Sequence, residues 1–207
     1  MVKRKNSNIQ RILSAFLIAV MFLMGFSTNA SAFNNGSAVR YADKYYKTYN
    51  TAKYRKFVRG DCANYVSQIL YAGGMGMNEN WRYKNSSTYT KSWAVANDLK
   101  NYLKYTYGAT FLGCWTKKGT SGDFPSYAYV NNSSNLLGQG NEVIVYDWHG
   151  EGIMDHVSFC VRTGKDPDSG RYGDLVNQHT TNRKDAIWNL DPYNPHRKTT
   201  RIYAFRV

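Results

Sequence analysis

Cys62 is the residue of this chain whose setting best suits a nucleophile. It lies in the stretch RGDCANYVSQ, residues 59–68, directly after Asp61 and at the expected start of a helix. Backbone N–H groups at a helix N-terminus lack partners and the helix dipole puts partial positive charge there, so both favour the reactive thiolate. The short side chain of Asp61 suits the N-cap of the same helix. On these residues alone, a small buried core cysteine is the competing interpretation.

The cysteine count leaves at least one free thiol. Besides Cys62 the chain has Cys114 and Cys160, and an odd number cannot pair completely. Three cysteines exclude a disulfide-dense scaffold, and the sequence has no C-x-x-C or H-x-x-x-H pair of the kind that binds zinc. A disulfide between Cys114 and Cys160 would leave Cys62 as the only free thiol, and two independent thiols are the alternative.

A cysteine nucleophile needs a base, and histidine is the usual one. The chain has four histidines. His149 and His196 lie in stretches typical of turns and loops, DWHGEG and DPYNPHRK. His156 opens the expected strand DHVSFCV and His179 lies inside DLVNQHT. The last two are the better candidates because strand positions are held most rigidly.

Strand alternation predicts which side chains meet, because alternate residues share a face. His156 and Ser158 would share one face of their strand. On the next strand Asn177 and His179 would share a face, while Gln178 points away. If the two strands pair as a hairpin, His156 lies beside His179 or Asn177, and either can accept its ring N–H and fix its tautomer. The alternative for each strand histidine is a purely structural role.

The order of the expected elements indicates an α+β domain. Apolar residues at helical spacing predict helices over 37–49, from Asp61 to the Gly73-Gly74 stop, and over 93–107, with Ser92 as the cap of the third. Residues 113–140 are rich in Gly, Ser and Asn and predict a long loop. Later stretches rich in β-branched and aromatic residues predict antiparallel strands, namely NEVIVYDW, DHVSFCVRTG, DLVNQHTT and RIYAFRV. Helices followed by strands are typical of α+β folds.

Residues 1–32 have the three parts of a secretory signal peptide. An apolar run over 12–26 is followed by the small-residue cleavage site Ala30-Ser31-Ala32. A membrane anchor is the alternative, but the run is shorter than the about 20 residues that a span needs. We therefore expect a signal peptide at 1–32, a single domain at 33–207, and a secreted protein without stable membrane insertion. The positive charges before the apolar run are Lys3, Arg4, Lys5 and Arg11.

The remaining domain is strongly basic. The formal net charge is +13, and removing the four cations of the signal peptide leaves +9. Outside a cell, the acidic partners of such a protein are anionic wall polymers, anionic lipid surfaces or nucleic acid. The 18 tyrosines and 5 tryptophans suit stacking on sugars, and a plain core with a solvated surface is the alternative. A nucleic-acid binder would rest on charge alone, because no recognised motif is present.

Several short motifs together resemble a known family. They are DCANYVSQ, AGG, NENWRY, KSW, MDHVSF and QHTTNR, and they extend from about Ala38 through nearly all of the remaining chain. As a set they resemble the secreted putative amidase domain family of bacteria, within the papain-like NlpC-type and CHAP-type cysteine hydrolases. The resemblance implies a papain-like α+β fold with N-terminal helices packed on a C-terminal antiparallel sheet.

The resemblance also implies roles for matching residues. Cys62 would be the nucleophile, and its backbone N–H part of an oxyanion hole. His156 would be the general base and then the general acid, with His179 orienting it and Asn177 as the alternative orienting residue.

Three further residues are candidates for a substrate groove. These are Asn64, Trp81 and Trp93, with the core as the competing place for the two tryptophans. The stretch DWHGEGIMDH resembles a calcium loop through Asp147, Glu151 and Asp155, although His149 replaces an expected oxygen ligand and no full EF-hand pattern is present. A plain β-turn is the alternative, and we predict no metal and no cofactor.

The sequence therefore predicts a secreted cysteine hydrolase that cleaves an amide bond through an acyl-enzyme. The resemblance implies peptidoglycan as the substrate, cut either at the muramoyl–alanine amide or within the stem peptide. A non-catalytic cell-wall-binding module on the same fold is the alternative function.

Overall fold

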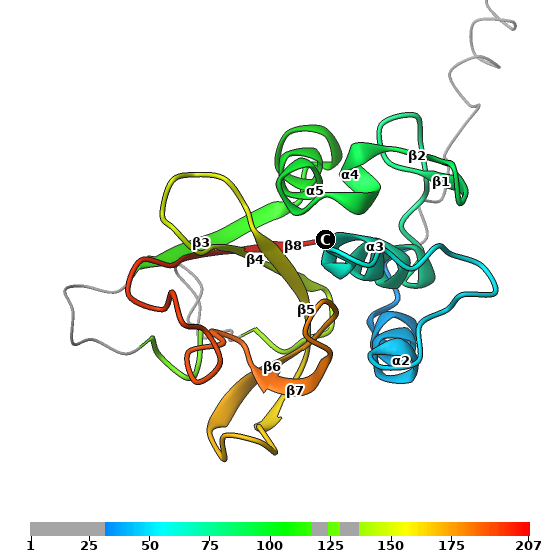
Figure 1. Ribbon diagram of the computed structural model, residues 1–207. Coiled ribbons are helices and arrows are strands. Elements are labelled where there is room, and N and C mark those ends of the chain that lie inside the picture. Colours follow the sequence, from blue (N-terminus) through cyan, green and yellow to red (C-terminus); the bar gives the residue numbers. More distant parts are fainter. Residues whose placement is uncertain (1–31, 117–123, 129–136) are drawn as a thin grey trace, which may run out of the picture. The chain divides into compact units, whose positions relative to one another are not determined.

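The computed structural model describes residues 32–116, 124–128 and 137–207 (Figure 1). The chain divides into two units, Met1–Ala32 and Phe33–Val207, and the description below concerns the second. The expected signal peptide lies, except for Ala32, outside the described residues, so it stays a prediction. Within the described ranges, no helix is both long and apolar enough to cross a membrane.

A six-stranded antiparallel sheet forms the larger part of the domain (Figure 1). Its spatial order is β3-β8-β4-β5-β6-β7, so the C-terminal strand lies between β3 and β4. All of its pairings are antiparallel. The strands are β3 (Thr110–Thr116), β4 (Glu142–Asp147), β5 (His156–Lys165), β6 (Tyr172–Gln178), β7 (Arg183–Ile187) and β8 (Arg201–Arg206).

Helices from the first half of the domain lie beside this sheet, with α3 packed against β5 and β6 (Figure 1). Gly73 ends α3, as the sequence predicts. The first nine residues of α3 are all buried, so it is a core helix and not an amphipathic surface helix. The helical elements are α2 (Asn35–Tyr45), α3 (Cys62–Ala72), α4 (Lys91–Ala94), α5 (Ala96–Tyr102) and the π-helical turn η1 (Leu103–Tyr107). A small hairpin of β1 (Tyr83–Asn85) and β2 (Thr88–Tyr89) precedes α4.

The predicted helix over 93–107 is divided into α4, α5 and η1. Val95 separates α4 from α5 because its backbone is extended, with φ −122° and ψ 127°. Ser92 does not cap a helix, since it lies inside α4 and its hydroxyl donates to the carbonyl of Asn80. Gly108 ends the segment in a left-handed conformation, φ 83°, as expected for a glycine in that place.

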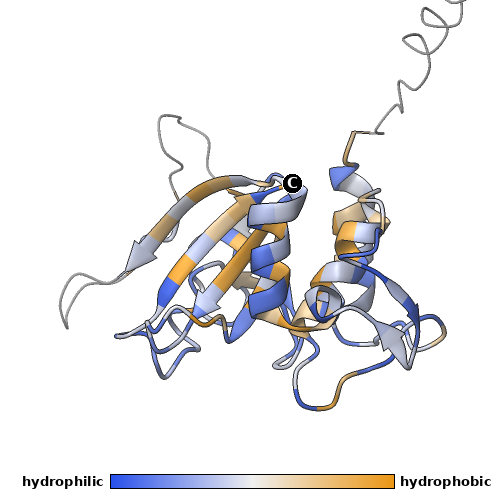
Figure 2. Ribbon diagram, turned by 90° about the horizontal axis from the view of Figure 1, so that it is seen from above, coloured by the Kyte–Doolittle hydropathy of each residue, from blue (hydrophilic) through white to orange (hydrophobic). Residues whose placement is uncertain are grey.

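The core lies where β4 and β5 meet the helices. All six residues of β4 and the first six of β5 are buried, because other strands flank both and α2 and α3 pack against β5. Figure 2 shows long hydrophobic stretches on the sheet strands, whereas most connecting segments are hydrophilic. A histidine at the first position of β5 is therefore held in a well-packed part of the domain.

A β-bulge sets the pairing of β5 with β6. Near the hairpin loop Arg162 pairs with Leu175, but beyond the bulge Cys160 pairs with Val176 and Phe159 with Asn177. The bulge leaves one residue of β5 without a counterpart and so shifts the register by one. Continued along the strands, this shifted register puts residue 178 opposite residue 158, on the face that carries His156.

Of the two alternatives for Cys114 and Cys160, the structure has two independent thiols and not a disulfide. Both thiols are free, with Cys114 exposed on β3 and Cys160 buried on β5. Two strands, β8 and β4, lie between β3 and β5. Three inter-strand steps separate the two backbones by about 14 Å, twice the largest Cα distance that a disulfide spans.

We predict that the denatured, unreduced protein has three titratable thiols. In the native protein Cys114 should react with a thiol reagent and Cys160 should react only after unfolding, because its exposed fraction is 0%. The measurement is thiol titration with and without denaturant, followed by peptide mapping. A single titratable thiol in denaturant would contradict the topology.

Candidate active site

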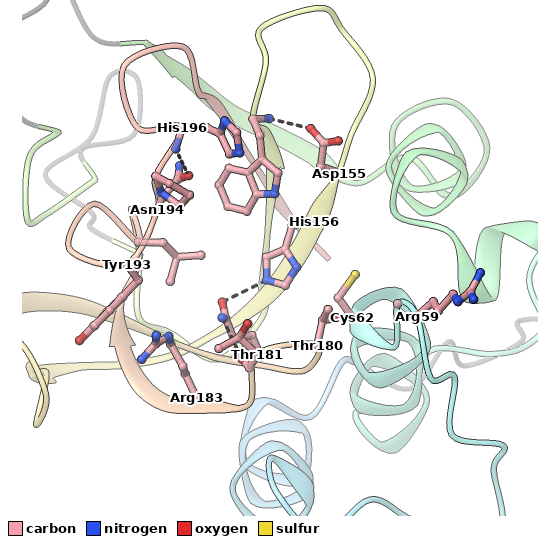
Figure 3. Close-up of a pocket in the computed structure, with 15 residues that line it drawn as sticks. Arg59, Cys62, Asp155, His156, Thr180, Thr181, Arg183, Tyr193, Asn194 and His196 are labelled. Atoms are coloured by element: carbon pink, nitrogen blue, oxygen red, sulfur yellow. Dashed lines mark hydrogen bonds between the residues drawn. The ribbon is translucent and has the colours of Figure 1, made fainter.

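Cys62 and His156 line one pocket of about 350 Å³. Cys62 is the first residue of α3 and has an exposed fraction of 6%. His156 is the first residue of β5 and is equally buried. Figure 3 shows the Cys62 sulfur pointing toward the His156 ring. The structure thus brings together the predicted nucleophile and the predicted base.

Gln178 orients His156. Its Oε1 lies 3.1 Å from His156 Nε2 (Figure 3), and its own Nε2 donates to the carbonyl of Thr181 at 3.0 Å. The second bond directs the amide oxygen toward the imidazole, so His156 Nε2 carries the proton and donates it to Gln178. The Nδ1 atom is then left as the acceptor, and it faces Cys62 in Figure 3.

The predicted orienting residues, His179 and Asn177, do not contact His156. Asn177 donates to Asp43 at 2.9 Å and accepts from the backbone N–H of Asp185 at 2.9 Å. His179 bonds to Asp61 and to the backbone of α2. The prediction failed because it assumed an uninterrupted hairpin register, and the bulge in β5 reverses which residues of β6 share a face with His156.

Burial favours the neutral forms of both Cys62 and His156. Desolvation lowers the pKa of His156 to about 4, against the opposing effects of the Gln178 hydrogen bond and the Asp155 charge. Desolvation likewise raises the pKa of the Cys62 thiol, and hydrogen bonds from the Val157 backbone and Thr180 offset it only in part. Burial therefore opposes the thiolate that the helix dipole favours, and it favours the unprotonated form of His156 that can accept a proton.

Asp61 occupies the N-cap position but does not cap α3 with its side chain. Its carboxylate accepts hydrogen bonds from the Phe57 backbone at 2.8 Å and from Asn64 Nδ2 at 2.9 Å. The other carboxylate oxygen lies 2.5 Å from His179 Nδ1. The expected role as a helix cap is replaced by a hydrogen bond with His179.

The three substrate-groove candidates are structural residues. Trp81 and Trp93 have exposed fractions of 0% and pack against each other, with ring centroids 4.9 Å apart. Asn64 accepts from Trp93 Nε1 at 2.8 Å and donates to the carbonyl of Arg55 at 2.9 Å. None of the three lines the pocket. Asn64 thereby links the segment before Cys62 to Trp93.

The pocket walls include residues that the sequence analysis missed. Trp148 stacks on His156 with centroids 5.7 Å apart and planes at 18°. Its backbone N–H donates to Asp155 at 2.8 Å (Figure 3). Across the pocket the Arg183 guanidinium lies 3.8 Å from the centroid of the Tyr193 ring. A tryptophan followed closely by a strand histidine was a usable signal, whereas nothing in the sequence pointed to Arg183 and Tyr193 as pocket residues.

The calcium-loop candidates form a hydrogen-bonded turn. Asp147 accepts from the backbone N–H groups of Gly150, Glu151 and Gly152 at 2.7, 3.1 and 2.7 Å. Asp155 accepts from a backbone N–H as well. Across the described ranges, no group of three or more His, Cys, Asp or Glu side chains is placed to hold a metal ion.

Comparison with known proteins assigns the family. Residues 32–203 match the model of a family described as a putative amidase domain. The chain belongs to this family. Its description indicates, at a general level, hydrolysis of amides.

Two proteins of Bacillus subtilis (strain 168) are similar to this chain, and both are described as uncharacterized. YhbB is 29% identical over 176 residues, which cover 82% of this chain and 49% of YhbB. YjcM is 27% identical over 164 residues, which cover 76% of this chain and 33% of YjcM. The chain therefore spans half or less of the length of these relatives. No solved structure matches.

Replacing Gln178 by glutamate should shift the acid limb of the pH–activity profile. A carboxylate beside Nε2 favours the imidazolium, so it raises the pKa of His156 from about 4 and makes His156 lose its basic form at a higher pH. We expect the acid limb of kcat/KM on an amide substrate to move up by about 1–2 pH units. The matched control is Gln139→Glu, an exposed position outside the pocket. An unmoved limb in Gln178→Glu would contradict the contact.

Proposed function

We propose that this chain is an exported cysteine hydrolase that cleaves an amide bond in peptidoglycan through an acyl-enzyme. One observation carries the proposal: Cys62 and His156 line the same pocket, and Gln178 holds His156 in the tautomer that leaves Nδ1 free toward the sulfur. A nucleophile, a base and a group that orients the base are the set that covalent amide hydrolysis requires.

In the first half-reaction, His156 Nδ1 takes the thiol proton of Cys62 as the sulfur adds to the amide carbonyl carbon. The resulting oxyanion accepts a hydrogen bond from the backbone N–H of Cys62. As the first residue of α3, Cys62 has no acceptor for this N–H within the helix. His156 then gives its proton to the amide nitrogen, the C–N bond breaks, and the amine leaves behind a thioester on Cys62.

In the second half-reaction, water replaces the amine. His156 takes a proton from the water molecule as its oxygen adds to the thioester carbon. The C–S bond then breaks, the acid product leaves, and the proton on His156 returns to the sulfur. Atoms and charge balance over the cycle, and the pair ends as it began, with a neutral thiol and a neutral imidazole.

The papain-like assignment is part of this proposal. Support comes from a buried helix that presents a cysteine at its first residue to a histidine that opens a strand of an antiparallel sheet. A glutamine in place of the expected histidine or asparagine still supplies a neutral hydrogen-bond acceptor for Nε2.

Peptidoglycan as the substrate class rests on charge and on the expected export. A domain with a net charge of +9 after loss of residues 1–32 is attracted to polymers that carry negative charge. The amide bonds of peptidoglycan, at the muramoyl–alanine junction and within the stem peptide, are of the type that the acyl transfer above cleaves.

We predict that Cys62→Ala and His156→Ala each abolish hydrolysis, by at least about a thousandfold, because nucleophile and base act as one unit. The measurement is digestion of purified wall material by the chain, with the products identified by mass. Cys114→Ser is the matched control, since this exposed thiol lies outside the pocket. Wild-type digestion by Cys62→Ala would overturn the proposal.

The same assay separates the alternative of a non-catalytic wall-binding module. In that case the wild-type chain would sediment with the wall material but release no product, and Cys62→Ala would bind equally well. New amino or carboxyl ends released by the wild-type protein alone support hydrolysis and identify which amide bond is cut.

A further inference from the structure

His179 has a hydrogen-bond acceptor at each ring nitrogen. Nδ1 lies 2.5 Å from the Asp61 carboxylate and Nε2 lies 2.8 Å from the backbone carbonyl of Tyr45. The side chain is buried, with an exposed fraction of 1%. Two acceptors are both satisfied when both nitrogens carry protons, which is the imidazolium form.

Two tyrosine rings enclose the His179 ring. Tyr65 stacks on it with centroids 3.8 Å apart and planes at 14°, and Tyr49 lies against it at 4.2 Å. The face of an aromatic ring carries negative potential and attracts a cation. The aromatic contacts therefore favour the same charged form as the two acceptors.

Asp61 carries its charge next to the nucleophile. It directly precedes Cys62, its exposed fraction is 1%, and its charge raises the pKa of the Cys62 thiol. An unpaired carboxylate in this buried place would oppose every step in which the sulfur becomes negative. His179 supplies the opposite charge at hydrogen-bond distance.

We propose that His179, held as an imidazolium, is a positioning residue that neutralises Asp61 beside Cys62 and ties the turn before the nucleophile to the end of β6. This proposal rests on the proposed function, in which Cys62 is the nucleophile. It gives His179 a role on the nucleophile, while the preceding residue, Gln178, acts on the base.

Thr180 adds a second tie between the same two segments. Its Oγ1 accepts from the backbone N–H of Asp61 at 3.2 Å, and it lines the pocket beside Cys62 (Figure 3). The φ of Thr180 is 80°, a conformation that β-branched residues rarely adopt. A strained residue persists where its surroundings impose it, and such positions cluster at functional sites.

Other charged groups surround the pair but do not replace this compensation. His156, the first residue of β5, and Asp155, directly before it, line the same pocket as Cys62. Arg59 lines the pocket, yet Figure 3 shows its side chain directed away from Cys62. Lys56 Nζ lies 4.0 Å from the ring of Tyr49, the tyrosine that lies against His179. The cation in direct contact with Asp61 among the described residues is therefore His179.

The test measures alkylation of Cys62 by iodoacetamide against pH, in a Cys114→Ser background and with the labelled peptide identified by mass. His179→Gln leaves Asp61 uncompensated, so we expect about tenfold slower alkylation at neutral pH and a profile displaced upward by about one unit. The double variant Asp61→Asn/His179→Gln removes both charges and should regain most of the lost rate.

A purely structural role for His179 predicts a different pattern. In that case the double variant would be as slow as His179→Gln, because both lack the tie to β6, and this result would overturn the proposal. So would a His179→Gln profile that superimposes on the wild-type profile. Alkylation needs no substrate, so the inference can fail while wall digestion by the Cys62–His156 pair is demonstrated, and the reverse also holds.

A measurement on the wild-type chain covers the case in which His179→Gln does not fold. NMR of protein labelled with ¹⁵N-histidine reports which ring nitrogens carry protons. Protons on both nitrogens of His179 at neutral pH support the proposal, and a neutral His179 ring overturns it.

Discussion

The register between β5 and β6 is the constraint on which the rest of the site depends. The bulge in β5 sets Phe159 opposite Asn177. Of the next two residues, Gln178 therefore lies on the face that carries His156, and His179 lies on the opposite face. Gln178 reaches His156 at 3.1 Å, and His179 reaches Asp61 at 2.5 Å. One strand end thereby contacts both His156 and Asp61, the residue before Cys62, and a slip of one residue would exchange these contacts.

Burial then determines how the pair works. A helix N-terminus favours the thiolate of a nearby cysteine, whereas removal from solvent raises the pKa of Cys62. The same burial lowers the pKa of His156 to about 4, so the imidazole stays neutral and able to accept a proton. Under the proposed function, proton transfer to His156 would accompany attack by the sulfur. Trp148 stacks on His156 and lines the same pocket.

Local signals in the sequence predict most of the elements and single out Cys62 and His156, which the structure places at one pocket. Helix-start chemistry marks Cys62, and a polar residue opening a β-branched strand marks His156. The hydrogen-bond partner of His156 could not be predicted from local sequence. The choice between Gln178 and His179 depends on the bulge in β5, which sets the pairing of two strands. The burial of Trp81 could not be predicted from the sequence either, because an aromatic residue near a site is equally compatible with a substrate groove and with the core. The strands β3 and β7 were missed where Gly113 and the charged run Arg183–Asp185 weaken the strand pattern.

The measurement that tests this account most directly is the protonation state of His156 in the resting chain. In ¹⁵N-histidine-labelled protein at about pH 7, well above its pKa of about 4, we expect a neutral ring with its proton on Nε2, hydrogen-bonded to Gln178, and a bare Nδ1 facing Cys62. Cys62→Ala should leave this state unchanged, because the thiol is itself neutral. An imidazolium at His156 that disappears in Cys62→Ala would show a thiolate–imidazolium pair, and a proton on Nδ1 of a neutral ring would show the wrong tautomer. Either result would contradict the account.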